Sequence, residues 1–207
     1  ALIVLLAACL LLDRFVLPRR LALLTAVALL GALAWTGHAG STLGPLGTLH
    51  LAADVLHLTA VSAWIGGLVG LPVLLAAGRR SSPEWGPLQL DAVQRFSTIG
   101  VASVAVLIGS GIVIAWILVG TFRGLVGTDY GQLLLLKIVV FATMVGFAAV
   151  NRLRLTPQLA RAAKGEADRG ALSALIRNSL IEFALALAIF AIVGVLGTLH
   201  PAIHLVQ

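Results

Sequence analysis

Long apolar runs alternate with short polar segments along almost the whole chain. The runs cover residues 1–12, 21–36, 50–76, 96–119, 131–150 and 178–199. Most of them approach the ~20 residues that an α-helix needs to cross the hydrocarbon core of a bilayer. The pattern therefore predicts an all-α fold, a polytopic transmembrane helical bundle of about six spans that forms a single domain over residues 1–207.

Residues that break helices lie between the runs. They are Pro18, the GHAG turn at 37–40, Gly44 with Pro45, the segment RRSSPEWGP at 79–87, Gly124 with Gly127, and Pro157. The run at 1–12 is too short to span a bilayer and the chain does not begin with Met, so we expect its helix to begin upstream of Ala1. It lacks the basic segment and the cleavage site of a signal peptide.

Composition agrees with lipid as the main solvent of the chain. Hydrophobic residues make up 60% of the sequence and charged residues 11%, with a mean hydropathy of +1.08, unlike an ordinary soluble domain. The formal charge of +6 comes from Lys and Arg residues that cluster between the apolar runs. We expect no nucleic-acid partner, because proteins that bind nucleic acid concentrate basic residues in a continuous patch or stripe.

The Lys and Arg clusters occupy alternate loops. The first, third and fifth loops hold Arg14, Arg19, Arg20, Arg79, Arg80, Arg95, Arg152, Arg154, Arg161, Lys164, Arg169 and Arg177. The second loop holds none and the fourth only Arg123. Because cytoplasmic loops are enriched in Lys and Arg, this alternation predicts that the odd loops are cytoplasmic and that the C-terminus lies outside.

This topology places every histidine at the extracytoplasmic face. The five histidines are His38, His50, His57, His200 and His204. In the third run, His50, Asp54 and His57 stand at i, i+4 and i+7, so they fall within an arc of about 60° on one helix face. Imidazole and carboxylate ligands suit Cu(II), Zn and Ni, with the highest affinity for copper. We therefore predict a metal site formed by Asp54 and these histidines.

Each of these residues also has a purely structural interpretation. Histidines near a membrane interface often form hydrogen bonds without binding any ligand. An ionisable residue inside a span, in contrast, is costly and usually functional. The second argument favours a functional role for Asp54 and His57.

Three further residues extend the predicted site or path. Trp64 continues the histidine face one heptad deeper, and Lys137 in the fifth run lies at a depth similar to that of the predicted site. Lys137 either counters the carboxylate of that site or extends its ammonium group towards water. Glu182 lies near the opposite membrane face, where it is an exit-side or proton-coupling carboxylate, a capping group near Asn178, or a partner of Arg177.

Glycines recur within the third and fourth predicted spans. They are Gly66, Gly67, Gly70, Gly109 and Gly111. Small residues let helices approach closely in a membrane, so we expect these positions to serve helix packing.

Several short motifs follow one another in a recognisable order. They are W-x-GHA at 35–39, D-x-x-H-L-x-x-x-x-x-W-x-GG at 54–67, RFS at 95–97, SG at 110–111, YG-x-LLLLK at 130–137, NR at 151–152, and a last span with Glu182 that ends at Pro201. Together they resemble the CopD family of bacterial copper-resistance membrane proteins over nearly the whole chain.

The resemblance implies a multi-pass protein of the bacterial inner membrane that accepts copper from the periplasm and takes part in copper transport or resistance. It also implies a small periplasmic copper-binding partner. By motif, the copper contacts are His38, Asp54 and His57, whereas the other three histidines rest on topology and helix geometry alone. Soft ligands for Cu(I) are scarce, since Met144 and Cys9 are the only Met and Cys in the sequence.

Two alternative functions compete with copper handling. Helical bundles hold b-type haem between facing histidines, for which His57 and His200 are the candidates provided that they lie at one depth. A further interpretation makes the chain a structural subunit of a larger membrane complex. We do not expect an enzyme, because the sequence shows no Ser/His/Asp arrangement, no phosphate-binding glycine loop and no HExxH pair.

Overall fold

The computed structural model describes residues 16–35, 44–78, 85–162 and 170–204, and these residues are almost entirely helical. The helices are α2 (Val16–Ala34), α4 (Pro45–Gly78), α5 (Trp85–Val119), α6 (Phe122–Gly127), α7 (Asp129–Val150), the π-helix η1 (Asn151–Leu155), α8 (Thr156–Ala162), α9 (Gly170–Leu196) and the 3₁₀ helix η2 (Ala202–His204). No strand occurs among the described residues, and the predicted all-α fold is confirmed.

Four helices in the described part of the chain are long and apolar enough to cross a membrane. They are Pro45–Gly78, Gly86–Val119, Asp129–Ala162 and Gly170–Leu196, of which the third runs through α7, η1 and α8. The predicted span 21–36 corresponds to α2, whose apolar part, Arg20–Ala34, is shorter. The predicted partial helix 1–12 lies outside the described residues. The transmembrane helical bundle is therefore confirmed, while the count of about six spans stays a prediction.

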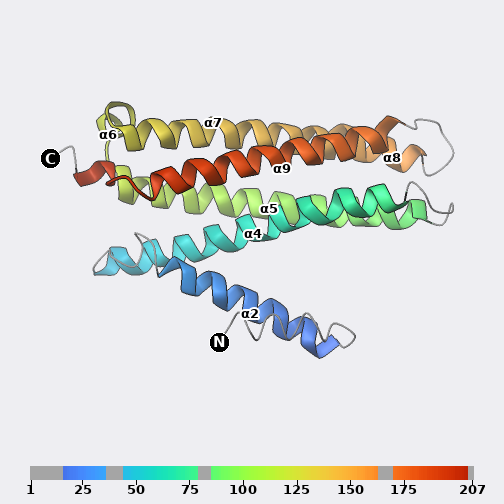
Figure 1. The fold of residues 1–207 in the computed structure, drawn as a ribbon, viewed down its shortest axis with the longest axis horizontal. Helices are drawn as coiled ribbons and strands as arrows, with labels where there is room; N and C mark the ends of the chain where they lie inside the picture. Colours follow the sequence, from blue (N-terminus) through green and yellow to red (C-terminus); the bar gives the residue numbers. More distant parts are fainter. Residues whose placement is uncertain (1–15, 36–43, 79–84, 163–169, 205–207) are drawn as a thin grey trace.

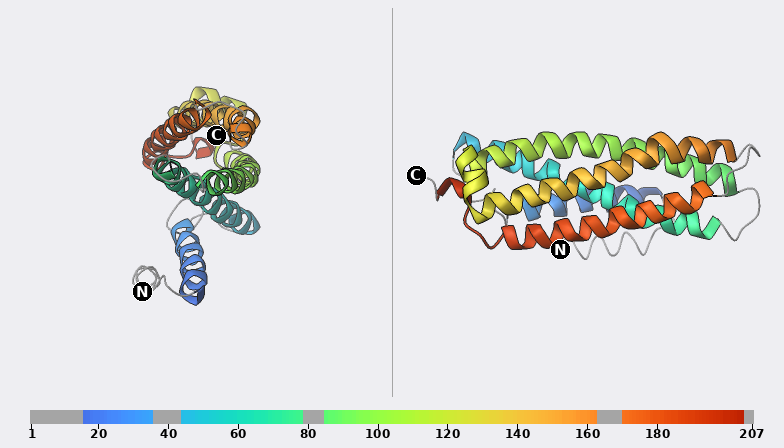
Figure 2. Two further views of the ribbon diagram at one scale, coloured as in Figure 1. Left: turned by 90° about the vertical axis from the view of Figure 1, so that its right-hand side faces the viewer. Right: turned by 90° about the horizontal axis from the view of Figure 1, so that it is seen from above.

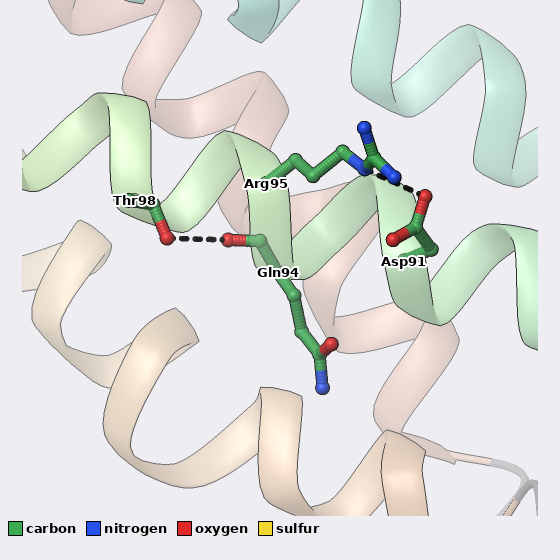
Figure 3. Close-up of polar contacts among 4 residues, drawn as sticks. All are labelled: Asp91, Gln94, Arg95 and Thr98. Atoms are coloured by element: carbon green, nitrogen blue, oxygen red, sulfur yellow. Dashed lines mark hydrogen bonds and ion pairs between the residues drawn. The ribbon is translucent and has the colours of Figure 1, made fainter.

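Two helices begin well before the apolar runs that predict them. α5 begins at Trp85 and α9 at Gly170, in both cases within polar sequence. An apolar run marks only the part of a helix that lies in hydrocarbon, whereas polar residues continue the helix into water. In the first turns of α5 such residues pair with one another on the exposed surface, where Arg95 Nε lies 2.8 Å from Asp91 Oδ2 (Figure 3).

The helix break predicted at Pro157 is wrong, because the helix continues to Ala162. Proline lacks an N–H group and its ring clashes with the carbonyl four residues earlier, which disrupts a regular α-helix. The wider turn of η1 precedes the proline, and in it the backbone N–H of Thr156 bonds to the carbonyl of Asn151. Thr156 Oγ1 donates to the same carbonyl over 2.8 Å. Such π-turns occur frequently at functional sites.

The four long helices form a ring when the bundle is viewed end-on (Figure 2). α4 packs against α5 and α9, and α7 packs against α9. α2 packs against α4 and runs away from the other helices (Figure 1). The short helix α6 lies at one end of the bundle and α8 at the other (Figure 1), and we call these the α6 end and the α8 end.

A buried apolar core occupies the middle of the ring. It consists of Ala60, Trp64, Leu68, Leu107, Met144 and Ala186, and we call it the central core. Lipid is as apolar as these side chains, so close packing holds such helices together more than hydrophobic burial does. A Cβ atom added to Gly67 of α4 would overlap the Phe96 ring of α5, which confirms the packing role of Gly67. For Gly66, Gly70 and Gly109, where an added Cβ would meet nothing described within 4 Å, that role stays a prediction.

Candidate functional site

α4 carries three of the predicted ligands on one face. Because it is a continuous α-helix from Pro45 to Gly78, residues at i, i+4 and i+7 lie on the same side. His50 is buried, and Asp54 and His57 are partly buried. Trp64 follows on that side and is only 2% exposed. The face of α4 with the predicted ligands therefore points into the bundle and not towards lipid.

The predicted ligands do not all meet at one point. An α-helix rises ~1.5 Å per residue, so His50 and His57 are separated by about 10 Å along α4. No group of three or more His, Cys, Asp or Glu within the described ranges lies close enough to hold a metal ion. His38 lies outside the described residues, as does the side chain of His204 at the end of η2, and His200 is exposed.

His57 is oriented by a contact with α5. Its Nδ1 atom lies 2.9 Å from the hydroxyl oxygen of Ser110. That hydroxyl donates its one hydrogen to the carbonyl of Val106 over 2.6 Å, so its oxygen accepts the hydrogen bond from His57 Nδ1–H. The neutral ring then keeps the lone pair of Nε2 for a ligand, as metal-binding histidines do.

Lys137 of α7 approaches the same part of α4. It interacts electrostatically with Asp54 and with His57, which agrees with its predicted role as a counter-charge. An ammonium group near a carboxylate lowers the cost of burying both charges. The same ammonium repels an incoming metal cation. We call Asp54, His57, Ser110 and Lys137 the His57 cluster.

A second polar cluster lies at the α8 end. Asn151 Nδ2 donates a hydrogen bond to Glu182 Oε1 over 2.6 Å, and Asn178 Nδ2 donates to Asn151 Oδ1 over 3.0 Å. Glu182, Asn178 and the neighbouring Ser179 are buried. α9 begins at Gly170, so Asn178 lies well inside the helix and the capping interpretation of Glu182 is wrong. We call Asn151, Asn178, Ser179 and Glu182 the Glu182 cluster.

The central core separates the two polar clusters. Trp64 lies within it and packs edge-on against Phe141, with the ring centroids 6.1 Å apart. Every buried residue of the central core is apolar. The two clusters therefore lie on opposite sides of a packed apolar cluster.

Sequence reasoning missed three residues that the structure places in the clusters. Ser110, Asn151 and Asn178 bond to residues 53, 31 and 27 positions away respectively. Ser110 and Asn151 belong to the SG and NR motifs, but no role followed from those motifs. The physical signal was a polar side chain inside or beside an apolar span, where polar groups are seldom tolerated without a partner.

The fold and the clusters define a class of protein: a multi-pass α-helical membrane protein with ionisable side chains buried inside its bundle. The sequence profile of the family described as "Copper resistance protein D" matches residues 90–196, more than half of the chain. The chain belongs to this family, CopD, as its motifs indicate.

Three curated relatives agree with that assignment. Copper resistance protein D of Pseudomonas syringae pv. tomato is 35% identical over 175 residues, which are 83% of this chain and 56% of the relative. Inner membrane protein YebZ of Escherichia coli (strain K12) is 33% identical over 189 residues, 89% of this chain and 60% of the relative. Copper transport protein CutJ of Bacillus subtilis (strain 168) is 34% identical over 123 residues, 59% of this chain and 22% of the relative.

The chain thus spans little more than half the length of the first two relatives. No solved structure matches it.

Proposed function

We propose that the chain is an inner-membrane copper-handling protein that accepts copper through Asp54 and His57 and takes part in copper transport or resistance. Membership of the CopD family and the names of two relatives support the proposal. The observation that carries it is the contact between His57 and Ser110, because it orients the ring and leaves Nε2 for a metal ion inside the bundle.

Copper needs more ligands than Asp54 and His57. We propose His38 as the third, since the GHA motif places it a short distance before α4 in the sequence. Nitrogen and carboxylate ligands favour Cu(II), whereas Cu(I) prefers thiolate and thioether sulfur. The site therefore fits acceptance of Cu(II), and the reaction at it is binding and release without covalent chemistry.

The distribution of basic residues supports a periplasmic position for this site. The described arginines of the α8 end are Arg95, Arg152, Arg154, Arg161 and Arg177, whereas the α6 end has Arg123. Since Lys and Arg concentrate on the cytoplasmic side, the α8 end is proposed to be cytoplasmic and the α6 end periplasmic. The small periplasmic copper-binding partner that the family resemblance implies would deliver copper at the α6 end.

Onward movement of copper requires a change in helix packing. The central core, with Trp64 in its middle, lies between the His57 cluster and the α8 end. A packed apolar core does not open gradually but rearranges between discrete states. We therefore propose that copper docks at the α6 end first and that passage, where it occurs, follows a rearrangement around Trp64.

Copper titration of the purified, detergent-solubilised chain tests the proposed site. We expect about one copper ion per chain, and at least tenfold weaker binding after His57→Ala, because water rarely replaces a lost ligand inside a span. His200→Ala is the matched control, since His200 is exposed beyond α9. The copper affinity of this variant should equal that of the wild type. A folded His57→Ala variant with unchanged affinity would show that the site on α4 is wrong.

The absorption spectrum of the same sample separates copper from haem. The geometry argues against haem, because His57 lies against Ser110 within the bundle while His200 lies exposed beyond the end of α9. Haem ligation by the two would require both imidazoles at one depth. A Soret band accompanied by iron would overturn the copper proposal.

A further inference from the structure

A cavity of about 220 Å³ lies at the α8 end of the bundle, between α4, α5, η1 and α9. Most of its wall is apolar, and Trp64 of the central core forms part of it. Ser179 and Glu182 of α9 are among the residues that line it. Since a water molecule in liquid water takes up about 30 Å³, the cavity has room for several.

Two oxygen atoms of these lining residues are buried without a hydrogen-bond partner among the described residues. They are Oε2 of Glu182 and Oγ of Ser179, and both side chains are 1% exposed. The other carboxyl oxygen, Oε1, accepts the hydrogen bond from Asn151. A buried polar atom without a partner is unfavourable, so these two oxygens indicate a missing hydrogen-bonding ligand, for which the adjoining cavity has room.

None of the described residues that pack around Glu182 pairs with it as a cation. Arg152 also borders the cavity, but its Nη1 donates to Ser97 over 2.7 Å. The other described basic residues of the neighbouring elements, Arg154 on η1, Arg161 on α8 and Arg177 on α9 itself, are exposed. Lys137 on α7 and Asp54 on α4 belong to the His57 cluster beyond the central core, and Asp91 and Arg95 on α5 pair with each other.

The donor set selects the chemistry of the ligand. A carboxylate and a hydroxyl are hard oxygen groups, and without the imidazole nitrogen that the His57 cluster supplies they suit a proton or water better than copper. An unpaired carboxylate in a low-dielectric interior is costly, and binding a proton removes its charge. The site therefore has the composition of a proton acceptor and not that of a second copper site.

We propose that Glu182 is a proton-exchange site, in which Oε2 takes up a proton from water in the cavity and returns it to the same water. When protonated, the O–H group donates to that water, and Asn151 keeps the carboxyl in place through Oε1. Trp64 of the central core lines the cavity, and the proposed exchange takes place with the α8 end, where the cavity lies.

Infrared difference spectra of the full chain, recorded between alkaline and acidic pH in lipid nanodiscs, test the proposal. We expect the C=O band of a protonated carboxyl group in the wild type and its loss in Glu182→Gln. Asp91→Asn is the matched control, because Asp91 is an exposed carboxylate paired with Arg95 (Figure 3), and the band should persist in it. A band that persists in Glu182→Gln, or a wild type without such a band, overturns the proposal.

Carbodiimide labelling is done on the wild-type chain, so its result does not depend on whether the Glu182→Gln variant folds. Carbodiimides react with protonated carboxyl groups in apolar surroundings, and mass spectrometry should place the label on Glu182 at acidic pH. Protection by Na⁺ at constant pH would overturn the proposal in favour of a sodium site. Absence of label from Glu182 would also overturn it. The copper affinity of Glu182→Gln should equal that of the wild type. Failure of this inference can therefore be distinguished from failure of the proposed copper site.

Discussion

His57 owes its orientation to two consecutive residues of α5. Ser110 accepts its Nδ1–H, and a Cβ atom added to Gly111 would lie 3.8 Å from His57 Cε1, so the ring passes directly over this glycine. A ligand whose ring is held in place loses little freedom when a metal binds. In the proposed copper site, the serine and the glycine would therefore act on the metal through the histidine.

Ser110→Ala should weaken copper binding about tenfold without removing any ligand. The loss of the hydrogen bond releases the His57 ring and its tautomer, and removal of such a supporting contact typically costs a factor of 10 to 100 in metal affinity. Copper titration measures the effect. Ser103→Ala is the control, because Ser103 is also buried on α5 but is not part of the His57 cluster. Equal affinity in the two variants would contradict this role of Ser110.

Lys137→Gln should strengthen copper binding about tenfold, in the opposite direction from the other variants. It removes a positive charge that interacts with both Asp54 and His57, and a tenfold change corresponds to ~1.4 kcal/mol. The measurement is the same titration at low and at high salt. Arg123→Gln, which removes an exposed cation near the α6 end, is the control and should leave the affinity unchanged. Weaker binding in Lys137→Gln would mean that the ammonium assists the site.

At the scale of the helices, the α4–α5 interface depends on one glycine of a pair. Gly67 faces the ring of Phe96, whereas its neighbour Gly66 has open space where a side chain would be. Both positions are glycine, so residue type does not distinguish them. The rotation of α4 about its axis decides which of the two faces α5. The same rotation turns Asp54 and His57 inwards.

Gly67→Val should destabilise the bundle, and Gly66→Val should not. Forcing a bulky side chain into a packed interface costs ~1–3 kcal/mol, because the ring of Phe96 has to move. Thermal unfolding of the detergent-solubilised protein, followed by loss of its monodisperse gel-filtration peak, measures the difference. Equal midpoints for the two variants would show that α4 and α5 do not approach each other at Gly67.

At the scale of the molecule, the bundle has two polar clusters with the apolar central core between them. The His57 cluster combines a histidine, a carboxylate and an ammonium group, whereas the Glu182 cluster contains amides, a hydroxyl and a carboxyl group. The first suits a metal ion and the second suits a proton. The function of the whole chain depends on which end of the bundle faces which compartment.

Labelling of single cysteines in a bacterial host checks that orientation. In a Cys9→Ser background, a cysteine at Val126 in α6 should react in intact spheroplasts with a maleimide that does not cross membranes. A cysteine at Arg161 in α8 should react only after the membrane is permeabilised. Both positions are exposed in the structure, so access to the reagent decides the outcome. The reverse pattern would place the His57 cluster on the cytoplasmic side.

The sequence by itself determined the class of fold, the places where the long helices lie and the shared face of His50, Asp54 and His57 on α4. Each of these depends on properties of a single segment: apolar length sets a membrane span, and helix period sets a face. Helix ends were less predictable, as Trp85, Gly170 and the π-turn before Pro157 demonstrate, because polar residues and a wider turn continue a helix beyond its apolar run.

Only the tertiary structure decided which faces meet. The long helices are apolar around most of their circumference, and lipid and protein neighbours are equally apolar, so the pattern of side chains does not reveal which side is buried. For this reason the sequence did not pair Ser110 with His57 or Asn151 with Glu182, and it did not distinguish Gly67 from Gly66. Those pairings depend on the rotation and crossing of helices that are distant in sequence.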